Sequence, residues 1–172
     1  MSVEFEKKVL SLNGGFIPSK PKFEFLYRLI ADCGPPIEIG NVEKGFLKVI
    51  PIIGGQFEGP KLKGIVLPIG ADWNTENHYQ STTKGIDTRY ILQTDDGVNI
   101  SLSTKGYVQQ SEEIMLEKRS GHPVDPDTYY FRQHLFFECG DERYSWINNV
   151  VAIGSVMSKT NRGVIYDAYI IR

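Results

Sequence analysis

The chain has 172 residues, enough for one domain to bury a core of its own without support from metals or disulfides. Its 19 basic and 21 acidic residues give a formal charge of −2 and are mixed along the sequence, with no basic run that could follow a phosphate backbone, so we expect no nucleic-acid partner. The two cysteines, Cys33 and Cys139, are too few for a disulfide framework and have no metal-ligand spacing, so we expect packed thiols.

Residues 1–22 lack the features of an export signal. Acids lie where a signal peptide has basic residues, and no stretch of the sequence reaches the roughly 18 apolar residues of a membrane span. We therefore expect a soluble, cytoplasmic protein with no membrane partner. Residues 1–22 would form an N-terminal extension to a single domain covering 1–172, and the formation of a homodimer stays open.

From residue 23 onward, short alternating blocks are separated by glycine, proline, asparagine and aspartate, a pattern typical of strands. The predicted strands cover residues 23–31, 44–53, 62–68, 86–94, 98–106, 107–117, 128–139, 143–157 and 163–172. The segment 112–119 also has helical composition, so helix, strand and loop stay open there. We expect loops at 74–85 and 118–128.

Turn residues predict how these strands pair. Asp96-Gly97 lies between two alternating runs, a strong hairpin signal, and Gly140-Asp141 predicts a second hairpin. A long run of antiparallel neighbours leaves exposed edges unless the sheet closes. The sequence therefore predicts an all-β fold: a single antiparallel β-barrel of eight to ten strands with little helix.

A stretch rich in glycine and proline, residues 54–73, ends on Asp72 and Trp73. Glycine bends strands at bulges and barrel corners, so this composition favours a closing sheet. We expect Gly70 to set a turn that aims Asp72 and Trp73 across the open mouth of the barrel. Alternatively, Asp72 caps that turn and Trp73 belongs to the core.

Alternation within the predicted strands separates two faces. One face, with Tyr90 and Phe131, looks like core. The other is the predicted working face, and it comprises Asp87, Arg89, Ile91, Gln93, Tyr130, Arg132, His134, Phe136, Glu138, Tyr144, Trp146 and Asn148.

The chemistry of this face favours an organic anion or an oxygen-rich ring. We expect Arg89, Arg132 and Trp146 to line one cavity, where two guanidinium groups can hold a carboxylate or enolate beside an aromatic ring. The alternative is that both arginines lie on solvated strands, or pair with Asp87 and Glu138.

Among the three histidines, His134 is the best candidate for a general base, because it shares a face with Arg132. The histidines have no metal-ligand spacing, and the sequence has neither a P-loop nor a dinucleotide fingerprint. We therefore expect no metal and no cofactor.

With these residues laid out, the chain resembles the DUF3237 family of bacteria and fungi, also called UPF0311, from about Phe23 to the C-terminus. The resemblance rests on FLKVIPIIGGQFEGPKLKGIVLPIGADW, DTRYILQTDDGVNI, YFRQHLFFECGDERYSWIN and VIYDAYII, in that order. It implies a small antiparallel barrel of lipocalin-like or allene-oxide-cyclase-like shape, but no particular reaction. The chain departs from the pattern at Ile69, where Gly-Gly more often precedes Ala-Asp-Trp. The residues that fall in the motifs are Glu58, Asp72, Trp73, Asp87, Arg89, Tyr90, Arg132, Glu138, Tyr144, Trp146 and Asn148.

Two functions fit these features. The first is a cofactor-independent isomerase, cyclase or lyase that acts on a hydrophobic oxygenated metabolite in the barrel lumen. Its candidate catalytic residues are Asp72, Asp87, Arg89 and His134, and its candidate substrate-binding residues are Glu58, Trp73, Tyr130, Arg132, Glu138, Tyr144, Trp146 and Asn148. The alternative is a non-catalytic carrier of lipocalin type for a small hydrophobic or oxygenated organic ligand. An acid and a cationic donor that converge on one pocket would favour the enzyme.

Overall fold

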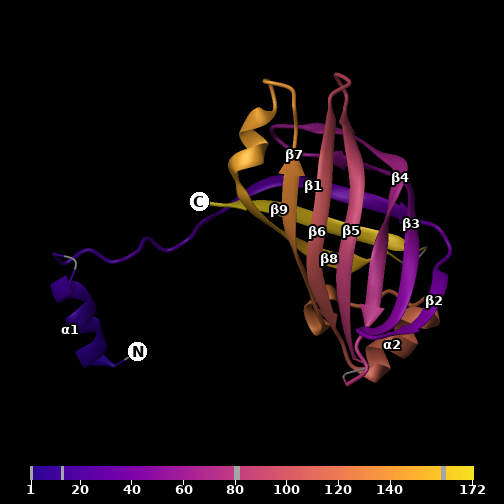
Figure 1. The fold of residues 1–172 in the computed structure, drawn as a ribbon, viewed down its shortest axis with the longest axis horizontal. Helices are drawn as coiled ribbons and strands as arrows, with labels where there is room; N and C mark the ends of the chain where they lie inside the picture. The colour runs from indigo at the N-terminus through magenta and orange to yellow at the C-terminus, as the bar shows by residue number, and fades with distance from the viewer. Residues whose placement is uncertain (1, 13, 80–81, 160–161) are drawn as a thin grey trace.

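Antiparallel strands make up most of the chain (Figure 1). The computed structural model describes residues 2–12, 14–79, 82–159 and 162–172. Its elements are α1 (Val3–Leu12), β1 (Phe23–Cys33), β2 (Ile37–Val42), β3 (Gly45–Glu58), β4 (Lys63–Glu76), β5 (Thr83–Thr94), β6 (Asn99–Gln109), α2 (Glu112–Arg119), the 3-10 helix η1 (Pro126–Thr128), β7 (Tyr130–Glu138), the 3-10 helix η2 (Ser145–Asn149), β8 (Val151–Ser158) and β9 (Gly163–Ile171).

The strands form one sheet whose ends meet. Its order is β1-β9-β8-β7-β6-β5-β4-β3-β2, and β1 also pairs with β3. Eight strands therefore close into a ring, while β2 lies outside the ring as an antiparallel partner of β3. This closure confirms the predicted antiparallel β-barrel with little helix.

Glycine permits the close approach of β1 and β3 where the ring closes. Gly55 lies opposite Ala31 with a φ of 146°, and a Cβ at Gly55 would lie 2.1 Å from the carbonyl oxygen of Ile30. A Cβ at Gly59 would lie 2.0 Å from the carbonyl oxygen of Leu26. A side chain at either position would push the two strands apart.

The β5–β6 hairpin turns at Asp96-Gly97 as predicted. The backbone N–H of Thr94 donates to the carbonyl of Val98 at 2.9 Å, so three residues form the loop. Gly97 takes the positive φ, 85°, that a type I turn followed by a bulge requires.

The second predicted hairpin, at Gly140-Asp141, is corrected, because the two paired strands are not joined by a tight turn. β7 and β8 do pair, but η2 lies between them, so the predicted strand 143–157 begins only at Val151. Local side-chain bonds explain the difference. Asn148 Oδ1 accepts from the N–H of Cys139 at 2.7 Å, and Asn148 Nδ2 donates to the carbonyl of Cys139 at 2.8 Å. These bonds replace a strand ladder at this corner.

Two other predicted boundaries are corrected. β4 continues to Glu76, so Asp72 lies within a strand, between Ile50 of β3 and Thr88 of β5, and not on a turn. The predicted strand 107–117 is divided, because β6 ends at Gln109 and α2 then begins. The Ser111 hydroxyl caps α2 by accepting from a backbone N–H, which is a strong signal for a helix start.

The inward-facing side chains of the barrel form a hydrophobic core, and some of the same residues line a cavity. Tyr27, Leu92, Ile100 and Phe137 are buried among the core residues. Figure 1 shows α2 at the opposite end of the barrel from the β5–β6 hairpin.

The helix α1 lies away from the barrel and has no buried residue (Figure 1). Among the described residues, no helix is long and apolar enough to cross a membrane.

Candidate functional site

The barrel encloses a cavity of about 400 Å³ on the side of α2. The strands supply its wall through their inward-facing side chains, and α2 supplies part of its mouth. The apolar wall residues are Ala31, Ile50, Ile52, Ile86, Val108, Phe131 and Val164. A largely apolar cavity of this size suits a small organic molecule.

Asp72 on β4 brings a carboxyl group into this cavity. Its Oδ1 accepts from the Thr88 hydroxyl at 3.0 Å and from the N–H of Asp87 at 3.1 Å, and its Oδ2 accepts from Asn74 Nδ2 at 3.3 Å. Burial raises the pKa of Asp72, while these three hydrogen bonds oppose the rise because they favour the ionised form. The net rise favours a neutral carboxyl group beside apolar surface.

Three tyrosine hydroxyls form a buried chain that reaches the cavity. Tyr27 Oη lies 3.2 Å from Tyr166 Oη, which lies 2.7 Å from Tyr90 Oη. Tyr90 and Tyr166 line the cavity, whereas Tyr27 is completely buried in the core. Burial raises the pKa of all three hydroxyls, so they stay neutral and remain hydrogen-bond donors.

Cationic side chains gather on the same lining. They are Lys48, Lys84, Lys118, Arg119 and Arg162. Lys48 and Lys84 share one carboxylate oxygen, Oε1 of Glu76, at 2.8 and 2.9 Å. Because one carboxylate serves two of these lysines, the cationic side chains around the cavity outnumber their carboxylate partners.

Lys118 of α2 has neutral partners. Its Nζ donates to Gln110 Oε1 at 2.8 Å and lies 3.2 Å from the centroid of the Tyr129 ring. Burial, and then the neighbouring Lys84, lower the pKa of Lys118 to about 8. Among the described residues, no carboxylate forms an ion pair with this amine.

Cys33 of β1 also lines the cavity. Burial, and then the charge of Asp72, raise the pKa of the Cys33 thiol to about 11. The thiol is therefore neutral and a poor nucleophile at physiological pH.

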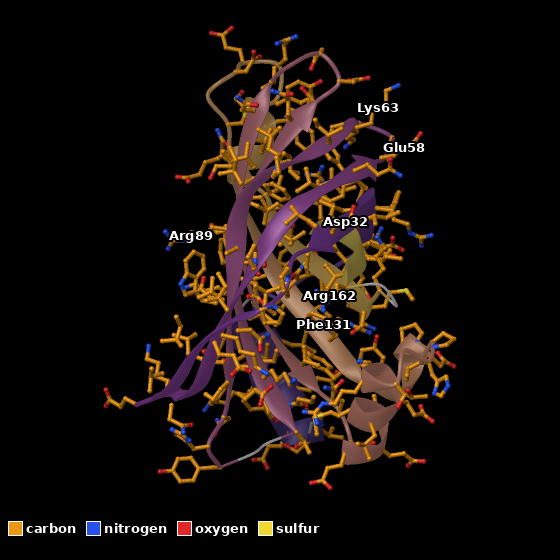
Figure 2. The ribbon with its side chains drawn as sticks, turned by 90° about the vertical axis from the view of Figure 1, so that its right-hand side faces the viewer. Asp32, Glu58, Lys63, Arg89, Phe131 and Arg162 are labelled. Carbon is orange, nitrogen blue, oxygen red and sulfur yellow. The ribbon has the colours of Figure 1, made fainter. Side chains whose placement is uncertain are left out.

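Of the residues predicted for the site, Asp72 alone lines the cavity. The others lie outside it and are Glu58, Trp73, Asp87, Arg89, Tyr130, Arg132, His134, Glu138, Tyr144, Trp146 and Asn148. Figure 2 shows Arg89 at the outer edge of the barrel, away from Phe131 and Arg162, both of which line the cavity. The prediction that Arg89, Arg132 and Trp146 share one cavity is therefore wrong.

Several of these side chains have partners on the outer surface. Asp87 lies 3.7 Å from Lys105, and the ring of His134 stacks on that of Phe136. Arg132 Nη1 donates to the carbonyl of the preceding residue at 2.9 Å. These are contacts of a solvated outer face.

The remaining aromatic candidates lie around η2 and β4. The Tyr144 hydroxyl donates to Asp96 at 3.1 Å, and the ring of Trp146 packs under Lys61 with the amine 5.5 Å from the centroid. Trp73 follows Asp72 on β4, so it points outward, with 44% of its surface exposed. Tyr144 and Trp146 are half-buried and pack against the hydrophobic core, whereas Trp73 lies on the outer surface. None of these rings lines the cavity.

On β5 and β7 the alternation separated the two faces correctly, but the face predicted to line the cavity is the outer one. Residues 145–149 form the 3-10 helix η2, so the alternation predicted there does not apply. The face that reads as core includes polar residues, Thr88 and Gln133, and these line the cavity together with Tyr90 and Phe131. Thr88 lies two residues before Tyr90 on β5, so a polar residue on the predicted core face was the sequence signal that Tyr90 lines a cavity. No pattern in the sequence pointed to Lys118, because it belongs to a helix whose placement depends on the fold.

The described residues hold no group of three or more histidine, cysteine, aspartate or glutamate side chains that could bind a metal ion. The described lining of the cavity consists of an apolar wall, hydroxyl groups, side-chain amides, one thiol, one carboxyl group and several cations.

Comparison with known proteins supplies a family. The family described as "Protein of unknown function (DUF3237)" matches residues 21–171. A UPF0311 protein of Rhodopseudomonas palustris is 30% identical over 142 residues, which is 83% of this chain and 92% of that protein. The crystal structure of a beta-barrel like protein from Acinetobacter baumannii has a TM-score of 0.78 and 42% identity, and it covers 91% of this chain and 99% of that one.

One relative has a named activity. A hydroalkoxylation enzyme of Penicillium herquei is 24% identical over 141 residues, which is 82% of this chain and 78% of that protein.

Proposed function

The chain belongs to the DUF3237 family, and from the geometry of its lumen we propose that it binds a small oxygenated organic molecule and catalyses a cofactor-independent proton transfer on it. Asp72 carries this proposal, because it is a carboxyl group of raised pKa on the wall of an apolar cavity. An acid of this kind stays protonated closer to neutral pH and can therefore act as a general acid.

The two oxygens of Asp72 are unequal. Oδ1 accepts two hydrogen bonds, from Thr88 and from the N–H of Asp87, whereas Oδ2 accepts one longer bond. The more weakly held oxygen is the better place for the proton. We assign the transferable proton to Oδ2.

The tyrosine chain supplies a donor for an oxygen of the ligand. Three hydroxyls share two hydrogen bonds, so one proton is left at an end of the chain. Tyr27 is enclosed by core, and its proton is satisfied only if it donates to Tyr166. Tyr166 then donates to Tyr90, whose own proton is free to bind a ligand oxygen in the cavity.

The named activity of the fungal relative supports a reaction class. Hydroalkoxylation adds an O–H bond across a carbon–carbon double bond. In such a step the Asp72 proton forms a C–H bond as the π bond breaks, the hydroxyl oxygen forms a C–O bond at the other carbon, and the hydroxyl proton returns to Asp72. Substrate and product are isomers, so no oxidant or reductant is required.

The test uses a phenol with a neighbouring trisubstituted alkene, 2-(3-methylbut-2-enyl)phenol, in D₂O. We expect closure of a new oxygen-containing ring, with one deuterium on the former alkene carbon that receives the proton. Asp72→Asn should abolish this product, while Asp87→Asn should retain it, because the Asp87 side chain pairs with Lys105 outside the barrel. Equal turnover by both variants would contradict the role of Asp72.

A carrier uses the same lumen without proton transfer, and the three hydrogen bonds that Asp72 accepts within the protein are the observation that favours it. Binding of the phenol without any cyclisation would support the carrier. Failure of the phenol to bind would contradict this ligand class for the lumen.

A further inference from the structure

We propose that the ligand of the lumen is an organic anion, whose carboxylate or similar acidic oxygen group binds between Lys84 and Lys118 while its apolar body lies against Phe131. This inference rests on the proposed function, because it names the chemical class of molecule that the same cavity takes. It draws on the cations at the mouth, which the proton-transfer step does not use.

The charges on the lining are unbalanced. Two lysines, Lys48 and Lys84, share the single carboxylate of Glu76. Asp72 is the one carboxyl group on the described lining, whereas five cationic side chains line the same cavity. An acidic group on the ligand would supply the missing negative charge.

Lys118 is the cation that most needs a partner. Its amine contacts the Gln110 amide oxygen and the face of the Tyr129 ring. Both groups are uncharged, so neither neutralises the charge of the amine. Burial and the like charge of Lys84 act against its ionised form, and its pKa of about 8 reflects both. A bound anion would offset both effects with charge-assisted hydrogen bonds.

Other titratable groups around the mouth do not remove this imbalance. Those that line the cavity or pair with its lining are Cys33 on β1, Lys48 on β3, Asp72 and Glu76 on β4, Lys84 and Tyr90 on β5, Tyr129 before β7, Lys118 and Arg119 on α2, Arg162 before β9, Tyr166 on β9, and the Asp32–Lys159 pair beside them. The Asp32 carboxylate is already paired with Lys159, and the one of Glu76 with two lysines. Burial raises the pKa of Cys33, Tyr90 and Tyr166, so these three groups are neutral near pH 7.

The apolar wall defines the rest of the ligand. The cavity of about 400 Å³ has room for a bicyclic aromatic body, and Ile52, Ile86 and Phe131 give that body apolar contact. The predicted ligand is therefore amphipathic, with a charged end at the mouth and an apolar end inside.

The test compares two fluorescent probes with the same ring and the same side-chain length, the anionic 2-naphthaleneacetate and the neutral 2-(2-naphthyl)ethanol. Titration of the full-length protein at pH 7 should give a Kd for the carboxylate at least about tenfold lower than for the alcohol. Phe131→Ala should weaken both probes, since both place the ring in the lumen.

Two substitutions of Lys118 separate charge from packing. Lys118→Met should remove the preference for the carboxylate, whereas Lys118→Arg should keep it. As pH rises through about 8, the wild-type preference should fall because Lys118 loses its proton, while the Lys118→Arg preference should persist. Lys105→Met removes the same charge from the outer surface and should leave the preference unchanged.

Equal affinity for the two probes would overturn the anion inference and leave the lumen as a binding site. A loss of preference in Lys105→Met as large as in Lys118→Met would also overturn it, because the effect would then come from net charge. If neither probe bound, both the inference and the proposed lumen function would be contradicted.

Discussion

Asp72 combines burial with hydrogen bonding in a way that suits proton transfer. Burial favours its neutral form, whereas the donors Thr88, Asn74 and the N–H of Asp87 stabilise the anion once the proton has left. A general acid needs both properties, because it must hold a proton at the working pH and also release it.

The first prediction concerns activity. Asp72→Asn keeps an oxygen that can accept from Thr88 and from the N–H of Asp87, but it has no transferable proton. We expect turnover to fall by about 10²–10⁴-fold. The melting temperature should fall slightly, because the amide nitrogen that replaces Oδ2 cannot accept from Asn74 Nδ2. Activity and thermal melting must be measured on the same preparations, since full activity with a lowered melting temperature would assign Asp72 a structural role.

The second prediction concerns stability and pH. Because the folded protein raises the pKa of Asp72, the folded state binds this proton more tightly than the unfolded chain does. The contribution of Asp72 to the free energy of unfolding is therefore present at low pH and is lost as pH rises through the folded-state pKa. Hydrogen bonds from Arg172 and then Lys61 lower the pKa of Glu24 to about 2. The contribution of Glu24 to stability is therefore lost as pH falls, and it is the same in wild type and in Asp72→Asn.

Urea unfolding of wild type and Asp72→Asn between pH 4 and 8 measures this term. The variant should become more stable relative to wild type as the pH rises, since asparagine does not titrate. Parallel stability curves for the two proteins would show that Asp72 keeps an ordinary pKa.

At the scale of elements, the contact between β1 and β3 closes the barrel. Gly54 and Gly55 both have a φ of 146°, yet only Gly55 faces a carbonyl oxygen across this contact. A Cβ at Gly54 would meet nothing within 4 Å. The two glycines therefore separate the cost of backbone strain from the cost of forcing strands apart.

The third prediction uses this pair. Gly54→Ala should carry only the strain of a positive φ, whereas Gly55→Ala should be less stable by a further 1–3 kcal/mol or so, because it also collides with Ile30. Chemical denaturation measures both. Equal losses of stability in the two variants would mean that the contact between β1 and β3 accommodates the added methyl group without cost.

Much of this element structure could be predicted from the sequence, because alternation and turn residues are local signals. The strands around Tyr90 and Phe131 and the turn at Gly97 follow from them directly. The corner at Asn148 did not, since a side chain bonded to Cys139 overrides the strand pattern there. The inward direction of each face, and the arrival of Lys118 at the mouth, depend on how the sheet closes.

At the scale of the whole molecule, the barrel from β1 to β9 contains both the core and the cavity. The family match begins at residue 21, and α1 lies away from the barrel with no buried residue. Lys22 is the first residue tied to the barrel, through backbone bonds of 2.8 and 2.9 Å with Arg172. Residues before it make no described contribution to the core.

The fourth prediction is that removal of residues 2–19 leaves the barrel intact. We expect the free energy of unfolding to change by less than about 0.5 kcal/mol, as for surface changes generally. The affinity for 2-naphthaleneacetate should also be unchanged. A large drop in melting temperature would place the helix α1 against the barrel in solution.

The most direct test of the lumen as the functional site is a crystal structure of the protein with 2-naphthaleneacetate. We predict the naphthalene ring inside the barrel against Phe131 and within reach of Asp72, with the carboxylate between Lys84 and Lys118. A ring bound on the outer face, beside Arg89 or Trp146, would contradict the assignment of the lumen as the functional site and restore the face that the sequence pattern favoured.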